Sequence, residues 1–297
     1  MITVSYSPAY TGSGHAFDTT RKSKWVADSL DARPIPGLEI RAPEPLDESL
    51  LSEVHDPEYI RAVRSGEPRV LAESQGFPWD AELWPMVLAS NGGAASAAVS
   101  AMQNKIAGSL SSGLHHARRD RGAGFCTFNG LAIAAHTALA AGAKSVLILD
   151  LDAHCGGGTF SLIANNPGIW HLDVSVAGYD MYTASRRTTL DVIHDAEEYL
   201  PKIARRLSDL DDGAPPFDLC LYNAGMDPHE DCVIGGLPGI NRDVLASREQ
   251  IVFEWCRERR TAIAFVLAGG YKGGRLEESA LVDIHRLTLD AAVTSLR

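Results

Sequence analysis

The sequence lacks an excess of basic residues and is poor in cysteine. Its 297 residues include 27 lysines and arginines against 38 aspartates and glutamates, which gives a formal net charge of −11. Because phosphate backbones are bound by basic surfaces, this balance argues against a general nucleic-acid-binding protein and favours a cationic substrate or partner. The five cysteines are scattered and include no CxxC pair, so neither a secreted disulfide framework nor a structural zinc finger is expected.

The sequence also lacks long hydrophobic runs, internal repeats and linker-like tracts. Its first residues, MITVSYSPAY, do not combine a basic segment with an apolar one, so we expect no signal peptide and a cytoplasmic location. The longest weakly polar stretch, residues 131–143, is too short to span a bilayer. We therefore expect a single domain over residues 1–297, without a membrane span.

Short apolar runs alternate with helical patterns along the chain. Strands are expected at residues 146–149, 169–174, 219–222 and 262–267, because each run is apolar nearly throughout, as in strands covered on both faces. Helices are expected at residues 131–141, 192–207, 243–259 and 276–296. Gly142 follows the first of them, where glycine is typical of a helix end. This alternation predicts an α/β fold with three layers, α/β/α, around a central, mostly parallel sheet.

Polar residues and glycines follow each of the four expected strands. These clusters begin at Asp150, Asp173, Asn223 and Ala268. In open α/β sheets, ligands bind outside the carboxyl ends of the strands. Several such clusters therefore predict one site at that edge of the sheet.

The segment Asp150-Leu-Asp152-Ala-His154 carries a pattern suited to metal binding. In an extended segment alternate residues point to one side, so two carboxylates and an imidazole would converge, as zinc or another divalent first-row ion requires. Taken alone, the pattern is also compatible with an acidic turn and a solvated histidine. The glycine turn at residues 156–158 favours the metal site, and Asp227, after another expected strand, is the natural third ligand. Three protein ligands with an open position are typical of catalytic zinc sites.

Two further segments could supply catalytic groups. His115 and His116 lie in a glycine-rich loop, and two imidazoles near a metal could serve as general base and electrostatic partner. Neighbouring histidines are also common as plain surface residues. Tyr271 follows two glycines at the end of an expected strand. It could donate a hydrogen bond to a developing oxyanion, or it could be a packed core tyrosine.

Together, these motifs resemble the zinc-dependent histone deacetylase family, whose members have the arginase–deacetylase fold. The shared motifs are, in order, HH, GFC, DxDxH, NAGxD and GGY, and residues 6–10, 15–18 and 55–60 match the N-terminal third of the family. Residues 115–126 and 222–227 resemble in particular its class IV branch, and the compact chain resembles a bacterial member.

The resemblance implies a role for each matching residue. It implies that Asp152, His154 and Asp227 bind one zinc ion. It implies that His116 is the general base, that His115 is its electrostatic partner hydrogen-bonded to Asp150, and that Tyr271 polarises the amide carbonyl. It further implies that Gly124 and Phe125 line a tunnel for the acyl-lysine stem, opposite Tyr179 or Tyr182, and that a potassium ion binds near Asp150, Asp152, His154 and Ser175, mostly through backbone oxygens.

Three positions depart from the family pattern. Cys155 stands where a second histidine is common, and we interpret it as tuning the site; a thiol beside a metal could also be redox-sensitive or add a ligand. Gly157 replaces the aspartate or asparagine that usually orients the second histidine of the pair. The orientation and basicity of His116 are then not fixed by this position, and a water molecule could substitute for the missing side chain. Gly130 stands where an acidic residue often follows the asparagine, and the sequence offers no account of it.

The expected activity is removal of acetyl or longer acyl groups from the ε-amine of lysine by metal-activated water. The class IV resemblance favours fatty acyl groups, whereas the negative net charge is compatible with acetylated polyamines or other small acylated amines. A dinuclear manganese ureohydrolase is disfavoured, because glycine occupies position 156, where that chemistry requires an aspartate. The remaining alternative is a non-catalytic protein that binds acyl groups or metabolites, and Gly157 is its main support.

Overall fold

A computed structural model of the protein describes residues 1–296. Within this range, eight strands form one sheet in the order β2-β1-β3-β8-β7-β4-β5-β6, and every neighbouring pair is parallel. The strands are β1 (Ile2–Ser5), β2 (Leu38–Arg41), β3 (Ile106–Ser109), β4 (Val146–Asp150), β5 (Ile169–Ser175), β6 (Thr188–Val192), β7 (Leu219–Gly225) and β8 (Ala262–Ala268).

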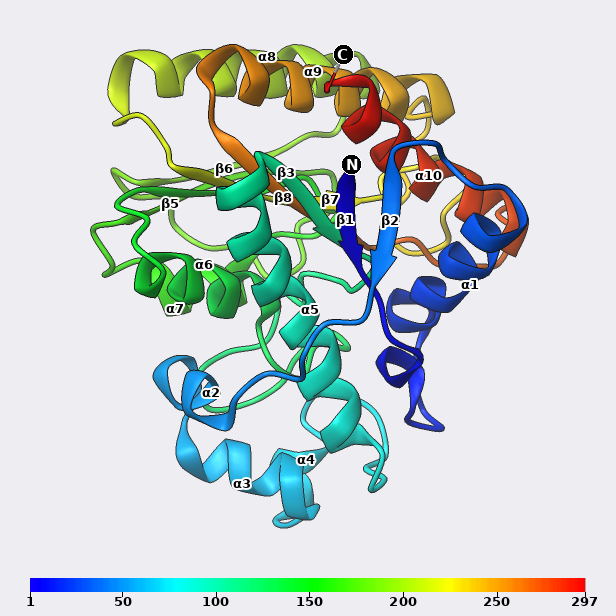
Figure 1. Ribbon diagram of the computed structural model, residues 1–297, viewed down its shortest axis with the longest axis vertical. Coiled ribbons are helices and arrows are strands. Elements are labelled where there is room, and N and C mark those ends of the chain that lie inside the picture. Colours follow the sequence, from blue (N-terminus) through cyan, green and yellow to red (C-terminus); the bar gives the residue numbers. More distant parts are fainter. Residues whose placement is uncertain (297) are drawn as a thin grey trace.

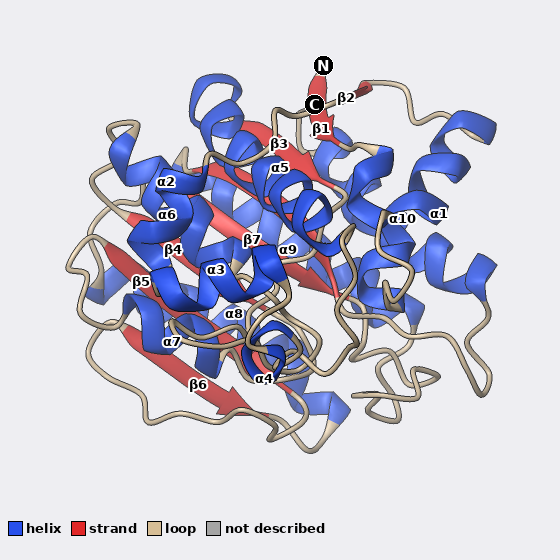
Figure 2. Ribbon diagram, turned by 90° about the horizontal axis from the view of Figure 1, so that it is seen from below, coloured by secondary structure: helices blue, strands red, loops and turns tan. Residues whose placement is uncertain are grey.

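Helices cover both faces of this sheet, which confirms the three-layer α/β architecture (Figures 1 and 2). One face packs against α1 (Asp18–Ala32), α8 (Ala196–Gly213), α9 (Arg242–Arg259) and α10 (Glu278–Thr294). The other packs against α2 (Glu48–Val54), α3 (Pro57–Ser65), α5 (Leu83–Asn104), α6 (Gly130–Ala140) and α7 (Gly157–Ile163). The short elements η1 (Pro8–Thr11) and α4 (Arg69–Ala72) complete the N-terminal third.

The central strands are apolar on both sides because each side meets a different core. In β4, Val146 and Ile148 lie in the core beneath α5 and α6, whereas Leu147 and Leu149 lie in the core beneath α8 and α9. All four side chains are fully buried. This is the physical reason that continuous apolar runs, rather than alternating ones, mark the inner strands of a parallel sheet.

The helix expected from residue 192 begins later than the sequence pattern indicated. Val192 ends strand β6, and helix α8 begins at Ala196 after Asp195, whose side chain accepts a hydrogen bond from the backbone N–H of Glu197. This is a standard N-terminal cap. The other expected helices and strands agree with the structure to within a few residues at their ends.

Because all the strands are parallel, their carboxyl ends meet at one edge of the sheet. The segments that follow β4, β5, β7 and β8 therefore gather there. None of the helices within residues 1–296 is long and apolar enough to cross a membrane.

Candidate metal centre

Three buried side chains from two strand ends converge at this edge. Asp152 and His154 follow β4, and Asp227 follows the neighbouring β7; their candidate ligand atoms all lie within 4.8 Å of one another. His154 Nδ1 is 3.2 Å from Asp152 Oδ1 and 3.1 Å from Asp227 Oδ2. Gly225 permits this approach, because a Cβ atom there would overlap the backbone of Asp152.

The ionisable groups of this cluster change one another's pKa values. Burial raises the pKa of Asp227 to about 6, and the carboxylate of Asp152 adds to this effect. For His154, burial acts to lower the pKa, but Asp152 and Asp227 outweigh it and raise the pKa to about 10. The site thus concentrates negative charge around one imidazole.

This donor set fits a divalent first-row ion. Two carboxylate oxygens and one imidazole nitrogen are ligands that such ions accept. A group of three leaves a coordination position for water or substrate, as in catalytic sites. The three residues expected from the sequence are therefore the three that could hold a metal ion here.

The histidine pair lies beside these residues, and its two rings face each other. His115 Nε2 and His116 Nε2 are 3.1 Å apart, and His115 Nε2 is 3.5 Å from Asp152 Oδ1. His115 Nδ1 donates to Asp150 Oδ2 at 2.7 Å. Asp150 also accepts a hydrogen bond of 2.7 Å from the side-chain amide of Asn223. The contact between His115 and Asp150 is the one expected from the sequence.

The pKa values of the two histidines are shifted in opposite directions. Burial acts to lower the pKa of His115, but Asp150 and Asp152 outweigh it and raise the pKa to about 10. Burial lowers the pKa of His116 to about 4, and the charge of His115 contributes in the same direction. At neutral pH, His115 therefore carries the proton, and His116 is neutral.

The Nδ1 atom of His116 contacts a residue that no motif in the sequence marks. This nitrogen donates to Asp180 Oδ2 at 3.0 Å. Asp180 lies between Tyr179 and Tyr182 in the loop after β5 and reaches the space beside Gly157. The sequence contains one indirect signal for it, namely the missing side chain at position 157.

The loop that carries the histidines is fixed by His55 from the N-terminal third and by Asn129, which caps α6. His55 Nδ1 donates to the carbonyl of Arg118 at 2.8 Å, and His55 Nε2 accepts from the N–H of Asn129 at 3.0 Å. The side-chain amide of Asn129 donates to the carbonyls of His115 and Ala117 at 3.2 and 3.1 Å. The sequence match around residue 55 thus corresponds to a support of the histidine loop.

Tyr271 reaches the same site through a glycine turn. Gly269 has a φ of +51°, and a Cβ atom there would overlap the carboxylate of Asp227. Tyr271 is 7% exposed. Burial raises the pKa of Tyr271 well above its ordinary value, and the nearby carboxylates of Asp227 and Asp152 act in the same direction. Its phenol therefore stays protonated and able to donate a hydrogen bond.

Of the residues expected to line the tunnel, some lie next to His116 and one does not. Gly124, with a φ of +50°, lies so close to His116 that a Cβ atom would overlap the imidazole, and Phe125 follows it. The ring of Tyr179 stands edge-on to His116, with centroids 4.9 Å apart. Tyr182 does not join them, because its hydroxyl donates to the carbonyl of Thr189 on β6 and its ring stacks on Phe160. Of the two tyrosines considered, Tyr179 is the one placed at the histidines.

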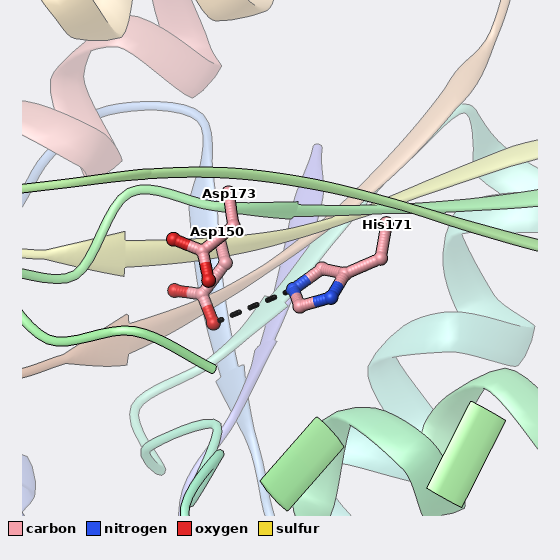
Figure 3. Close-up of side chains that lie close together, drawn as sticks. All are labelled: Asp150, His171 and Asp173. Atoms are coloured by element: carbon pink, nitrogen blue, oxygen red, sulfur yellow. Dashed lines mark ion pairs between the residues drawn. The ribbon is translucent and has the colours of Figure 1, made fainter. Parts of the chain in front are cut away.

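A second buried group lies next to the first and comprises Asp150, His171 and Asp173 (Figure 3). His171 Nε2 is 3.9 Å from Asp150 Oδ2, and Ser175 Oγ donates to Asp173 Oδ1 at 2.5 Å. Burial raises the pKa of Asp173 to about 7, with Asp150 adding to the effect. The potassium ion expected near Asp150, Asp152, His154 and Ser175 stays a prediction.

The departures at Cys155 and Gly130 have local explanations. Cys155 Sγ lies 3.5 Å from the carbonyl of Ala177, to which it donates, and burial raises the pKa of the thiol to about 12. A protonated thiol is a poor metal ligand and a weak nucleophile. At Gly130, a Cβ atom would lie 3.1 Å from Asn91 Oδ1 and 3.2 Å from the carbonyl of Gly113, so a longer acidic side chain would not fit without movement.

Comparisons with known proteins identify the family of the chain. The model of the histone deacetylase domain matches residues 15–287. An uncharacterised protein of the cyanobacterium Picosynechococcus is 32% identical over 243 residues, which cover 78% of this chain and 79% of that protein.

Two solved structures show the same fold. The crystal structure of the HD domain of HDA15 has a TM-score of 0.81 at 18% identity, covering 99% of this chain and 90% of the other. Acetylpolyamine aminohydrolase from Burkholderia pseudomallei has a TM-score of 0.78 at 17% identity, covering 98% of both chains. From the match across most of its length, the chain belongs to the histone deacetylase domain family.

Proposed function

We propose that this protein is a zinc-dependent amidohydrolase that removes acyl groups from the ε-amine of lysine. The observation that carries the proposal is the placement of the histidine pair directly beside Asp152, with an aspartate at the far nitrogen of each ring. A protein that only binds acyl groups would have no use for two imidazoles held in different protonation states.

Asp152, His154 and Asp227 are the residues that would hold the zinc ion. A zinc ion bound there would act as a Lewis acid that polarises an amide carbonyl and lowers the pKa of water toward neutrality. An amide is a poor electrophile with a poor leaving group, so both properties would favour its hydrolysis.

Three side chains of the protein would each have a separate role in the reaction. His116 is neutral with its hydrogen on Nδ1, so the lone pair of its Nε2 can accept a proton from the attacking water and later return it to the departing amine. His115 lies between Asp150 and His116 and stays positively charged, so it stabilises negative charge that develops on the substrate. Tyr271 donates its phenol hydrogen to the carbonyl oxygen, where the oxyanion forms.

The aromatic residues at the site favour an extended alkylamine. Phe125 and Tyr179 would face the methylene stem of lysine, and Phe125 is held by a hydrogen bond from its N–H to the carbonyl of Gln75 at 3.0 Å. Acetyl and longer acyl groups are both compatible with this arrangement. The resemblance to the class IV branch favours the longer acyl groups.

An acetylated polyamine is the second candidate substrate. The net charge of −11 favours a cationic substrate, and the fold is shared with an acetylpolyamine aminohydrolase. Both reactions cleave a linear amide and would use the same side chains. They differ in what lies outside the site, namely a polypeptide in one case and a small cation in the other.

The test is hydrolysis of a matched series of substrates by the zinc-loaded protein. The series comprises one peptide carrying acetyl-, octanoyl- or myristoyl-lysine, together with an acetylated polyamine, each with and without a chelator. Release that the chelator abolishes supports the zinc amidohydrolase, and the preferred substrate identifies the acyl length and the amine. A protein that holds zinc but cleaves none of them would support the binding function instead.

A further inference from the structure

Because residue 157 is glycine, its segment has no side chain there that could orient His116. Another part of the chain fills the space. A Cβ atom at position 157 would overlap the carbonyl oxygen of Asp180 and would lie 2.6 Å from its Oδ1. The loop after β5 therefore occupies the volume in which a side chain at position 157 would stand. Glycine at 157 is what permits this approach.

Within residues 1–296, the groups that donate hydrogen bonds to the carboxylate of Asp180 all lie around His116. Oδ2 accepts from His116 Nδ1 at 3.0 Å and from the N–H of Gly158 at 3.0 Å. Oδ1 is paired with the guanidinium of Arg118, which also donates to the carbonyl of Gly157 at 3.3 Å. The side chain of Asp180 is 9% exposed, so water competes little for these bonds.

The backbone at Asp180 is held in an uncommon conformation. Its φ is +62°, in the left-handed region where aspartate and asparagine are tolerated better than other side chains apart from glycine. This conformation is not required of a residue that only connects two segments of the chain. The turn directs the carboxylate back toward α7, where His116 and Gly158 meet it.

We propose that Asp180 is the positioning residue for His116 and replaces, from a different loop, the side chain that position 157 lacks. The inference rests on the proposed function of His116 as the base. A carboxylate at Nδ1 keeps the hydrogen on that nitrogen and leaves the lone pair on Nε2, which faces the site. The pair then has two aspartates, Asp150 for His115 and Asp180 for His116.

The main competing explanation is that Asp180 only anchors its loop through Arg118. The two roles predict different outcomes for two variants. Asp180→Ala removes both contacts, whereas Arg118→Met removes the ion pair and leaves the bonds of Asp180 to His116 and Gly158 in place. A third variant, Asp180→Asn, keeps the size of the side chain but removes the charge and replaces one of the two oxygen acceptors with an N–H donor.

The experiment measures kcat, KM and zinc content of these zinc-loaded variants on the best cleaved substrate. We expect Asp180→Ala to lower kcat by about 10- to 100-fold, the range found when partners of site residues are removed, while KM and zinc content stay within about threefold. Arg118→Met should keep kcat within about fivefold of the parent, whereas Asp180→Asn should lower kcat, because its amide N–H groups must face either His116 and Gly158 or Arg118, all of which are donors. A kcat for Asp180→Ala within threefold of the parent, or an equal loss in Arg118→Met, would overturn the proposal.

A second readout does not depend on activity. The ¹⁵N shifts of the His116 ring, identified with a His116→Ala reference, should report hydrogen on Nδ1 in the parent and loss of that preference in Asp180→Ala. Unchanged shifts would contradict the positioning role, even if no tested substrate were cleaved. If Asp180→Ala does not fold, Gly157→Ala serves in its place, because its added methyl displaces the same carboxylate and should lower kcat and shift the ring nitrogens in the same way.

Discussion

His115 and His116 face each other through their Nε2 atoms, 3.1 Å apart, and turn their Nδ1 atoms to two different aspartates. The pair is nevertheless asymmetric. His115 has two carboxylates within reach, those of Asp150 and Asp152, whereas the carboxylate at His116 is also paired with Arg118. One proton shared by the pair therefore resides on His115, and His116 is left free to accept another.

This asymmetry predicts unequal losses when each histidine is removed. His116→Ala should lower kcat by about a hundredfold to ten-thousandfold, the usual contribution of a general base. His115→Ala removes a charge next to the site but no proton acceptor, so its loss should be about 10- to 100-fold. Steady-state kinetics of both variants at equal zinc content provide the comparison. A larger loss in His115→Ala would reverse the assigned roles.

Asp227 is predicted to be required for metal binding. Asp227→Ala should reduce zinc from about one ion per chain to a small fraction of that, because only two of the three ligands remain. Asp191→Ala is a suitable control, since Asp191 is a partly buried aspartate whose partners are Lys202 and Arg206, at 3.2 and 2.6 Å. Elemental analysis after dialysis measures both. Full zinc occupancy in Asp227→Ala would remove this residue from the ligand set.

Tyr271→Phe is predicted to separate metal binding from turnover. The substitution keeps the buried ring and removes only the hydroxyl, so zinc content should be unchanged while kcat falls by about a hundredfold to a thousandfold, as when one oxyanion donor is lost. Tyr10→Phe is the matched control, because Tyr10 is also buried but its hydroxyl bonds to Ser109 Oγ at 3.1 Å. Equal kcat values for Tyr271→Phe and Tyr10→Phe would exclude the oxyanion role.

The sequence was sufficient to predict the site residues that lie just after the ends of apolar strands. Asp152 and His154 lie within a few residues of β4, and Asp227 lies just beyond β7, its direct neighbour in the sheet. An apolar strand is easily recognised, and parallel strands bring their carboxyl ends together whatever lies between them. Position along the chain was therefore enough to bring these three residues together.

Asp180 could not be found in the same way. It lies in an irregular loop, and its carboxylate is directed by a single left-handed turn that no periodic pattern marks. The strand that follows, β6, was missed for a related reason, because its sequence TTLDV is partly polar and only its first residue is fully buried. Gly157 was recognised as a gap, but the sequence alone does not show which distant residue fills it.

His55 leads to a prediction about stability and pH. Burial lowers its pKa to about 4, from 6.5 in the unfolded chain. Its two hydrogen bonds also require a neutral ring, because Nδ1 donates to the carbonyl of Arg118 and Nε2 accepts from the N–H of Asn129. The unfolded chain therefore binds this proton more readily. The contribution of His55 to stability is fully present above about pH 6.5 and is lost as the pH falls toward 4.

The expected size of this loss is about 2 kcal/mol between pH 7.5 and pH 5, from the difference between the two pKa values. Other buried groups titrate in the same range, so the informative quantity is the difference between the parent and His55→Gln. Urea unfolding at the two pH values gives the free energy of unfolding of each. The parent should lose about 2 kcal/mol more than the variant on acidification, because glutamine has no proton to gain. Parallel losses in the two proteins would show that His55 is protonated in the folded chain as readily as in the unfolded one, and the support of the histidine loop would then not depend on a neutral ring.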